Sequence, residues 1–269
     1  MEHTSMKRRS FIRTGALFVP TIVGVVKAQI PMSVGDGAFV GRHRSTGYAD
    51  LPSNYSGLVA WWKADTIVQS DNTAVTSWAD SSGLSNTLSQ GTGGNQPKFR
   101  TNIQNGLPAV QFDGTNDFLS MTTKVPYTTN PNSPYTIIVI NEVTNNVSGN
   151  RFFYSTVTGD GAIRNNNSFG LQVLAVATRT SDAYTTTFNN VWNMCSVSST
   201  GPGTVDFFDK ATAKGNRVSL SAAPSFNQMC DSIGPFGGYI GEACIWTSAL
   251  SAANIASLYN NYFSLRWGI

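Results

Sequence analysis

The feature that most constrains the fold is a series of short apolar runs between residues 51 and 269, each bounded by Gly, Asn, Asp, Ser or Pro. Such runs, spaced roughly 8–15 residues apart, are typical of β-strands joined by turns. They predict an all-β fold, an antiparallel two-sheet sandwich. No repeat of propeller or solenoid length is present. The expected strands cover residues 57–62, 74–78, 109–112, 118–121, 135–141, 151–157, 169–177, 191–198, 204–208 and 238–246.

One segment near the end of the sequence departs from this pattern. Ser251 is a favourable N-cap residue, and apolar residues come after it at the spacing of a helix face. These residues are Ile255, Leu258, Tyr259, Tyr262 and Leu265. We expect one C-terminal amphipathic helix that covers the sandwich.

The N-terminus carries an export pattern. Residues 7–13 (KRRSFIR) resemble the twin-arginine motif through Arg8, Arg9 and Phe11. The uncharged run 14–26 is too short to span a bilayer, and residues 26–28 (VKA) fit a cleavage site before Gln29. We expect residues 1–28 to be a signal peptide and the protein to be exported to the periplasm, the cell surface or the medium. The alternative is an arm that is retained and docks into an assembly such as a virion.

The composition of residues 29–269 indicates a linker followed by a folded domain, and its charge limits the possible partners. Residues 29–50 lack periodicity and are expected to form a linker, and residues 51–269 are expected to form the folded domain. The net charge of +3 arises in the leader, because five of the 18 Lys and Arg residues but one of the 15 acidic residues lie within 1–28. A nearly neutral body argues against nucleic acid or an anionic membrane as a partner, and no segment is expected to span a membrane.

Three cysteines, Cys195, Cys230 and Cys244, do not have the spacing of a zinc site. An exported protein could form one disulfide, for which Cys230 and Cys244 are the natural pair. The alternative is three buried thiols that act as small apolar residues.

Four segments in order resemble one protein family. They are residues 57–65 (GLVAWWKAD), 75–83 (VTSWADSSG), 105–121 (NGLPAVQFDGTNDFLSM), and 241–251 (GEACIWTSALS) with the closing LRWG of 265–268. Together they resemble the LamG-like branch of the concanavalin A-like lectin/glucanase superfamily over residues 51–269. The resemblance implies a jelly roll of two stacked antiparallel sheets. It does not define a function, because lectins, hydrolases, adhesion modules and virion parts share this fold.

The third segment contains three oxygen-bearing side chains, Asp113, Asn116 and Asp117. Asp113-Gly114 between apolar runs predicts a tight hairpin turn, since Gly tolerates positive φ and Asp caps its own turn. The alternative is calcium, which LamG-like domains sometimes hold on a rim loop. Calcium needs six or more oxygens, and this segment alone cannot supply them. The turn is the favoured interpretation, and calcium is the one cofactor that stays open.

Catalytic residues are not expected. Hydrolases of this superfamily carry Glu-x-Asp-x-Glu or Glu-x-Asp-x-x-Glu on one strand, whereas the glutamates of this chain are Glu2, Glu142 and Glu242, far apart in sequence. The resemblance implies a structural role for Glu242. We therefore predict that the protein is not an enzyme, with a hydrolase or lyase of unrecognised site as an alternative.

Carbohydrate binding is the favoured function. Adjacent strand residues face opposite sides, so either Trp61 or Trp62 should point away from the main core, where sugars could stack on it. The alternative is that the helix or a loop covers that second face. Asn146 and Asn166 lie in Asn-rich turns that could bind glycan hydroxyls. The sequence thus predicts a lectin-like protein on a cell envelope or virion that binds glycan or neighbouring subunits, or a structural decoration or fibre subunit docked through its N-terminal arm.

Overall fold

The computed structural model describes residues 47–126, 133–145, 150–156, 162–166, 170–175, 178–181, 189–201, 203–218 and 224–269. Arg8, Arg9, Phe11 and Asn146 lie outside these ranges. Asn166 lies within them, although only its backbone is described. The described residues, from Gly47 to Ile269, belong to one compact unit. Within the described residues, no helix is both long and apolar enough to cross a membrane.

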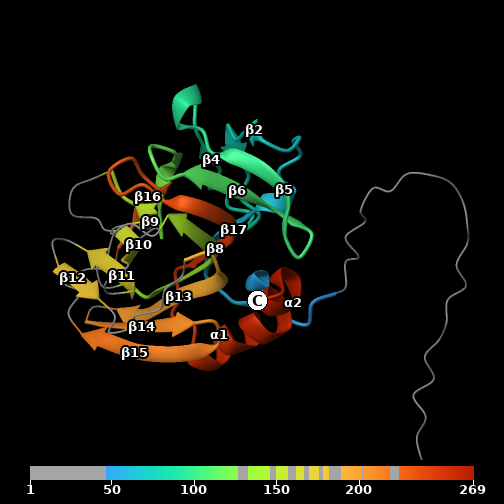
Figure 1. Cartoon of the computed structure of the whole chain (residues 1–269). Helices are drawn as coiled ribbons and strands as arrows, with labels where there is room; N and C mark the ends of the chain where they lie inside the picture. Colours follow the sequence, from blue (N-terminus) through green and yellow to red (C-terminus); the bar gives the residue numbers. More distant parts are fainter. Residues whose placement is uncertain are drawn as a thin grey trace, which may run out of the picture. The chain divides into compact units, whose positions relative to one another are not determined.

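The described strands form two antiparallel sheets, as the sequence predicts (Figure 1). Sheet A has the order β15-β14-β13-β8-β17-β6-β5-β2, with β1 also paired to β17. Its strands are β1 (Leu58–Lys63), β2 (Thr73–Ala74), β5 (Lys98–Gln104), β6 (Leu107–Asp113), β8 (Tyr135–Asn145), β13 (Trp192–Gly201), β14 (Thr204–Asp209), β15 (Thr212–Val218) and β17 (Gly237–Trp246).

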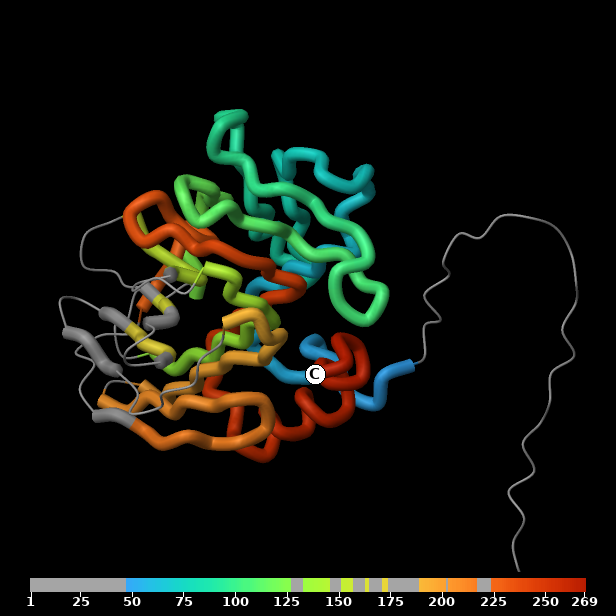
Figure 2. Tube along the Cα trace, viewed as in Figure 1, coloured from blue at the N-terminus to red at the C-terminus, as the bar shows by residue number. Residues whose placement is uncertain are grey.

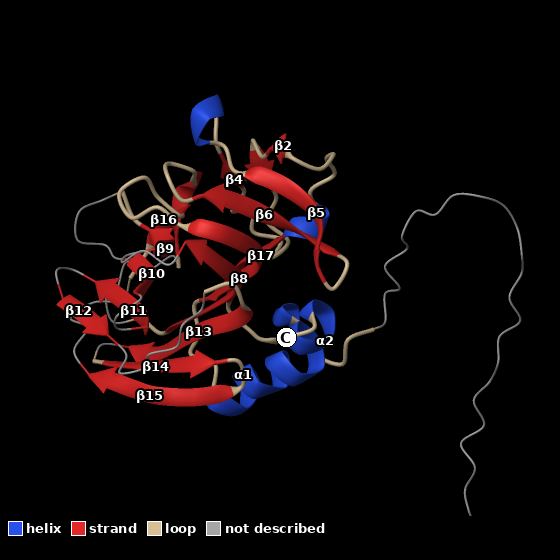
Figure 3. Cartoon of the chain, in the orientation of Figure 1, coloured by secondary structure: helices blue, strands red, loops and turns tan. Residues whose placement is uncertain are grey.

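Sheet B has the order β12-β11-β10-β9-β16-β7-β4-β3. Its strands are β3 (Ser77–Trp78), β4 (Leu88–Ser89), β7 (Leu119–Val125), β9 (Asn150–Tyr154), β10 (Ala162–Asn166), β11 (Gly170–Ala175), β12 (Thr178–Ser181) and β16 (Phe226–Met229). Short 3-10 turns lie at Pro52–Asn54, Ala64–Thr66 and Gly93–Asn95. Apart from these turns, the helix of the described residues is confined to the C-terminal end of the domain (Figure 3).

The centre of sheet A is buried on both faces, and β8 shows this most clearly. Ile137 and Val139 belong to the core between the two sheets. Ile138 and Ile140, which alternate with them, belong to a second core beneath the C-terminal helices. A strand buried on both faces has a nearly continuous run of apolar residues, and residues 135–140 (YTIIVI) form such a run.

The C-terminal segment covers sheet A with α1 (Ala252–Leu258), the π-helical turn η4 (Tyr259–Phe263) and α2 (Ser264–Trp267). Ser251 caps α1 by accepting a hydrogen bond from the Asn254 backbone N–H at 3.2 Å, as predicted. The predicted apolar face is wrong at Leu265, which is 63% exposed. A π-turn holds one extra residue, which rotates the following positions by ~100°. Phe263 and Trp267 are buried instead.

The folded domain begins before Leu51, which corrects the predicted linker boundary. The rings of Tyr48 and Tyr262 lie 4.9 Å apart between centroids, edge to face. Asp50 is buried and accepts hydrogen bonds from the hydroxyls of Tyr55 at 2.6 Å and Ser257 at 2.7 Å. Figure 2 traces this entering segment, in blue, to the red C-terminal helices. The segment therefore helps to hold the helices in place.

Candidate functional site

An open groove of about 570 Å³ lies at one end of sheet A, beside the end of α2. Its lining mixes apolar side chains with amides, one carboxylate and one ammonium group. The lining residues are Ile103, Gln104, Glu142, Asn190, Val191, Trp192, Lys210, Gly268 and Ile269.

One wall of the groove is the β5–β6 hairpin, which is tied to the end of α2. Asn105 and Gly106 adopt positive φ values of 50° and 78°, which an Asn-Gly turn permits. The Asn105 side-chain amide donates to the Arg266 carbonyl at 2.9 Å, and Gln104 Nε2 donates to the Trp267 carbonyl at 2.8 Å. These bonds satisfy carbonyls at the helix end and fix the hairpin against it.

Glu142 stands between two aromatic residues on neighbouring strands. On β8 it lies directly opposite Trp192 of β13 and opposite Tyr239 of β17. Residues paired in this way share one face of a sheet. The Trp192 and Tyr239 ring centroids are 6.3 Å apart, and Trp192 stacks on Trp267 at 5.4 Å with an interplanar angle of 10°.

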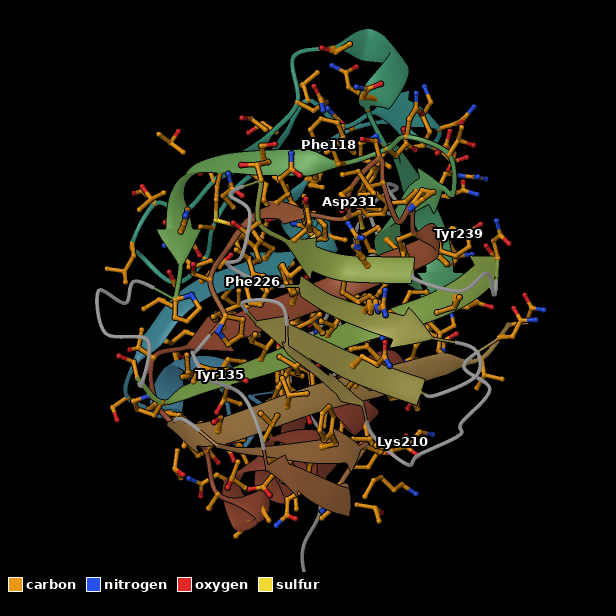
Figure 4. All side chains as sticks on the ribbon, turned by 90° about the vertical axis from the view of Figure 1, so that its left-hand side faces the viewer. Phe118, Tyr135, Lys210, Phe226, Asp231 and Tyr239 are labelled. Carbon is orange, nitrogen blue, oxygen red and sulfur yellow. The ribbon has the colours of Figure 1, made fainter. Side chains whose placement is uncertain are left out.

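The electrostatics of the groove depend on Glu142 and Lys210. Partial burial raises the pKa of the Glu142 carboxyl above its usual value, and a hydrogen bond from Trp192 opposes that rise. Lys210 enters from the turn between β14 and β15. Figure 4 shows Tyr239 and Lys210 toward the same side of the molecule in that view. Among the described lining residues, Glu142 alone has a carboxylate side chain, whereas glycoside hydrolysis generally uses a pair. The arrangement suits binding of hydroxyl groups.

The predicted sugar-stacking platform at Trp61 and Trp62 is wrong for the folded domain, because the two residues are 7% and 0% exposed. They do face opposite sides of β1, as expected. Trp62 packs in the core between the sheets and donates its indole N–H to the Asn86 carbonyl at 2.8 Å. Trp61 lies beneath the C-terminal helices, so the alternative of a covered second face is confirmed.

Glu242 joins sheet A to the helices. It is fully buried and accepts hydrogen bonds from the indoles of Trp61 at 2.5 Å and Trp267 at 3.0 Å, and from the Tyr262 hydroxyl at 2.8 Å. Arg266 pairs with it at 3.0 Å. Burial, together with the Glu242 charge, raises the pKa of the Tyr262 phenol well above its usual range. All four donors to Glu242 are side chains of this same chain. The contacts therefore fit the structural role that the family resemblance implies.

The residues considered for calcium form a corner rather than the predicted hairpin. β6 pairs with β5 and β17 in sheet A, whereas β7 pairs with β4 and β16 in sheet B. Residues 114–118 therefore carry the chain from one sheet to the other. Gly114 has a positive φ of 75°, as the turn interpretation predicts.

The oxygens at this corner accept backbone hydrogen bonds. Asp113 Oδ1 accepts from the N–H groups of Thr115 at 2.8 Å and Asn116 at 3.2 Å, and Asp117 Oδ2 accepts from the Asp113 N–H at 2.9 Å. Asn116 donates its side-chain amide to Asn95 at 3.1 Å. Within the described ranges, no three His, Cys, Asp or Glu residues gather as a metal site would require. Calcium at this corner stays a prediction.

The predicted Cys230–Cys244 disulfide is wrong, and the alternative of buried thiols is confirmed. Cys195, Cys230 and Cys244 are free and buried. Cys230 lies in the core between the sheets, whereas Cys244 lies in the core under the helices, so sheet A separates the two sulfurs. Burial raises the pKa of all three thiols, that of Cys195 to about 12.

Sequence reasoning missed the groove. It considered Glu142 only as a catalytic residue. Trp192, which lines the groove, is 8% exposed and belongs to the core beneath the C-terminal helices. The one local signal was the polar pair Asn141-Glu142, which interrupts a long apolar run. Of the two asparagines predicted to bind glycan, Asn146 lies outside the described residues, and the side chain of Asn166 is not described, so both stay predictions.

The protein is therefore an antiparallel two-sheet β-sandwich, and its open groove is lined by both polar and apolar residues. No family model matches the sequence, and no curated protein matches it. The fold is similar to domain 4 of AbnA, a GH43 extracellular arabinanase from Geobacillus stearothermophilus, solved in complex with arabinotriose. The TM-score is 0.56 at 14% identity, over 76% of this chain and 98% of that domain.

Two binding domains contain a similar sandwich over about half of their length. The binding domain of Paraclostridial Mosquitocidal Protein 1 has a TM-score of 0.56 at 12% identity, over 79% of this chain and 53% of that one. The botulinum neurotoxin serotype D binding domain has a TM-score of 0.53 at 11% identity, over 76% and 50%. This chain therefore spans about half of each of these two binding domains. At such identities the likeness shows the fold alone.

Proposed function

We propose that the sandwich is a non-catalytic glycan-binding domain and that the open groove is its binding site. The observation that carries the proposal is the groove lining, in which Val191, 56% exposed, and the 8% of Trp192 that is exposed lie beside a carboxylate, an ammonium group and two amides. Protein sites for small polar ligands combine apolar walls with a few placed polar groups in this way. A volume of about 570 Å³ is within the range of such sites.

Two further considerations support the proposal. A sandwich with the same fold has been solved with arabinotriose, and the two other matched sandwiches each form about half of a binding domain. The twin-arginine-like leader fits display outside the cytoplasm, on a cell envelope or a virion, as the LamG-like resemblance also suggests. We therefore propose an exported lectin-like protein rather than a purely structural subunit.

The test compares two exposed valines. Val191 is 56% exposed and lines the groove, whereas Val68 is 96% exposed and does not line it. The full chain is screened on a glycan array and by calorimetry against arabinotriose. Val191→Arg should weaken glycan binding at least about tenfold because the new side chain fills the groove, equivalent to about 1.4 kcal/mol. Val68→Arg should bind as the wild type does.

The outcomes separate the competing functions. Binding that survives Val191→Arg would move the site away from the groove. Absence of glycan binding by the wild type would favour the structural-subunit alternative. Release of reducing sugars from polysaccharides by the wild type would establish the hydrolase alternative instead.

A further inference from the structure

The position of Glu142 bears on which glycans the groove accepts, a role that rests on the proposed function. Glu142 and Lys210 are the charged side chains among the described lining residues. They approach the groove from different elements, Glu142 from the centre of sheet A and Lys210 from the turn between β14 and β15. A ligand carboxylate would be attracted by one and repelled by the other.

The Glu142 carboxylate is held in place through the aromatic residues beside it. Trp192 lies directly opposite it on β13, and the Trp192 ring stacks on Trp267 at 5.4 Å. Trp267 is anchored in turn by donating its indole N–H to buried Glu242 at 3.0 Å. This chain of contacts limits how far Glu142 can swing aside when a ligand enters. A fixed charge discriminates more strongly than a mobile one, because the groove cannot relax around a like-charged group.

Partial burial strengthens this discrimination. A like charge brought next to Glu142 loses water while it gains repulsion that solvent screens poorly. A neutral sugar hydroxyl, in contrast, can donate to the same carboxylate in a charge-assisted hydrogen bond. Glu142 thus favours uncharged saccharides and penalises acidic ones at one position.

We infer that Glu142 is the specificity-determining residue of the groove, which selects uncharged saccharides against acidic ones such as uronic acid oligomers. Without the Glu142 charge, Lys210 would attract an acidic saccharide with no opposing repulsion from the Glu142 side chain. Glu142 would therefore act by exclusion as well as by attraction.

The experiment uses a ligand pair of matched length, an α-1,4-linked galactotriose and trigalacturonate, in which a hydroxymethyl group is exchanged for a carboxylate. Arabinotriose serves as a second neutral probe. Affinities are measured by calorimetry for the wild type, Glu142→Gln and Lys210→Met. Glu142→Gln preserves the size of the side chain and removes its charge, and thermal unfolding checks that each variant folds.

The wild type should bind the neutral probes and discriminate against trigalacturonate. Glu142→Gln should raise trigalacturonate affinity about tenfold and lower neutral affinity, a change consistent with losing one charged hydrogen bond and one like-charge contact. Lys210→Met should lower trigalacturonate affinity further and leave neutral binding largely intact.

The two levels of the proposal fail differently. If the wild type binds neutral sugars in the groove and Glu142→Gln keeps its selectivity, the role of Glu142 is overturned and the glycan-binding function stands. A wild type that prefers trigalacturonate also overturns the inference. If no probe binds, and the array shows no glycan whose binding is weakened by Val191→Arg, the proposed function itself fails.

Discussion

Glu242 and Asp117 are both buried carboxylates, but their surroundings differ. Glu242 receives hydrogen bonds from four side chains, one of them the Arg266 guanidinium, so its desolvation is compensated. Asp117, 6% exposed, accepts one hydrogen bond from the Asp113 backbone, and burial raises its pKa to about 6. Asp117 should therefore make the stability depend on pH near neutrality.

The sign of the Asp117 effect is set by its raised pKa. The folded domain keeps a proton that the unfolded chain releases from about pH 4 upward. The resulting stabilisation is fully present below about pH 4 and is lost as the pH rises through about 6. Relative to Asp117→Asn, the wild type should lose up to about 3 kcal/mol between pH 4 and pH 7, measured by urea unfolding. If the free energy of unfolding of the two proteins changed in the same way with pH, this expectation would be contradicted.

At the scale of elements, the C-terminal segment shows how one irregular turn decides which residues are buried. The π-turn from Tyr259 to Phe263 rotates α2 so that Trp267 lies over β17. Gly241 on β17 provides the space, because a Cβ there would lie 2.2 Å from a Trp267 ring atom. The close approach of helix and strand therefore requires glycine at this position.

Gly241→Ala tests this close approach. The added methyl group should displace Trp267, destabilise the domain by about 1–3 kcal/mol and weaken the Trp192 stack beside the groove. Gly94→Ala is the matched control, because nothing lies within 4 Å of a Cβ there and its φ is not positive. Urea midpoints and glycan affinity are measured for both variants. Equal effects at the two glycines would show that Trp267 does not depend on Gly241.

At the scale of the whole domain, sheet A is the middle layer. Sheet B covers one face around the main core, and the C-terminal helices cover part of the other around the second core. β8 and β17 lie at the centre of sheet A and contribute to both cores. This explains why Trp61 and Trp62, adjacent on β1, are both buried although they face opposite ways.

The export hypothesis makes a prediction for the complete chain. If residues 1–28 are a twin-arginine signal, native protein should begin at Gln29, and Arg8→Lys combined with Arg9→Lys should retain it in the cytoplasm. Intact-mass measurement on native material, with cell fractionation of the variant, checks both points. A full-length mass on native material would refute cleavage and favour a docking arm.

Local chemistry in the sequence was sufficient to predict the all-β class, most strand positions, the Ser251 cap and the positive φ of Gly114. Each depends on alternation or on the preferences of one or two neighbouring residues. The sequence did not predict strands β4, β5, β10, β12, β15 and β16. The longest of these, β5 and β15, have mostly polar residues, KFRTNIQ and TAKGNRV, that lack regular alternation. These strands form through pairing with their neighbours rather than through propensity.

Only the tertiary structure decided which sheet each strand joins and which residues meet. The Asp113–Asp117 corner has the composition of a hairpin, yet its two strands pair with other partners, in different sheets. Cys230 and Cys244 are close in sequence and lie in different cores. The groove brings together Gln104, Glu142, Trp192 and Lys210 from separate segments. Long-range strand pairing and helix packing determine these placements, because they depend on contacts that local residue preferences do not encode.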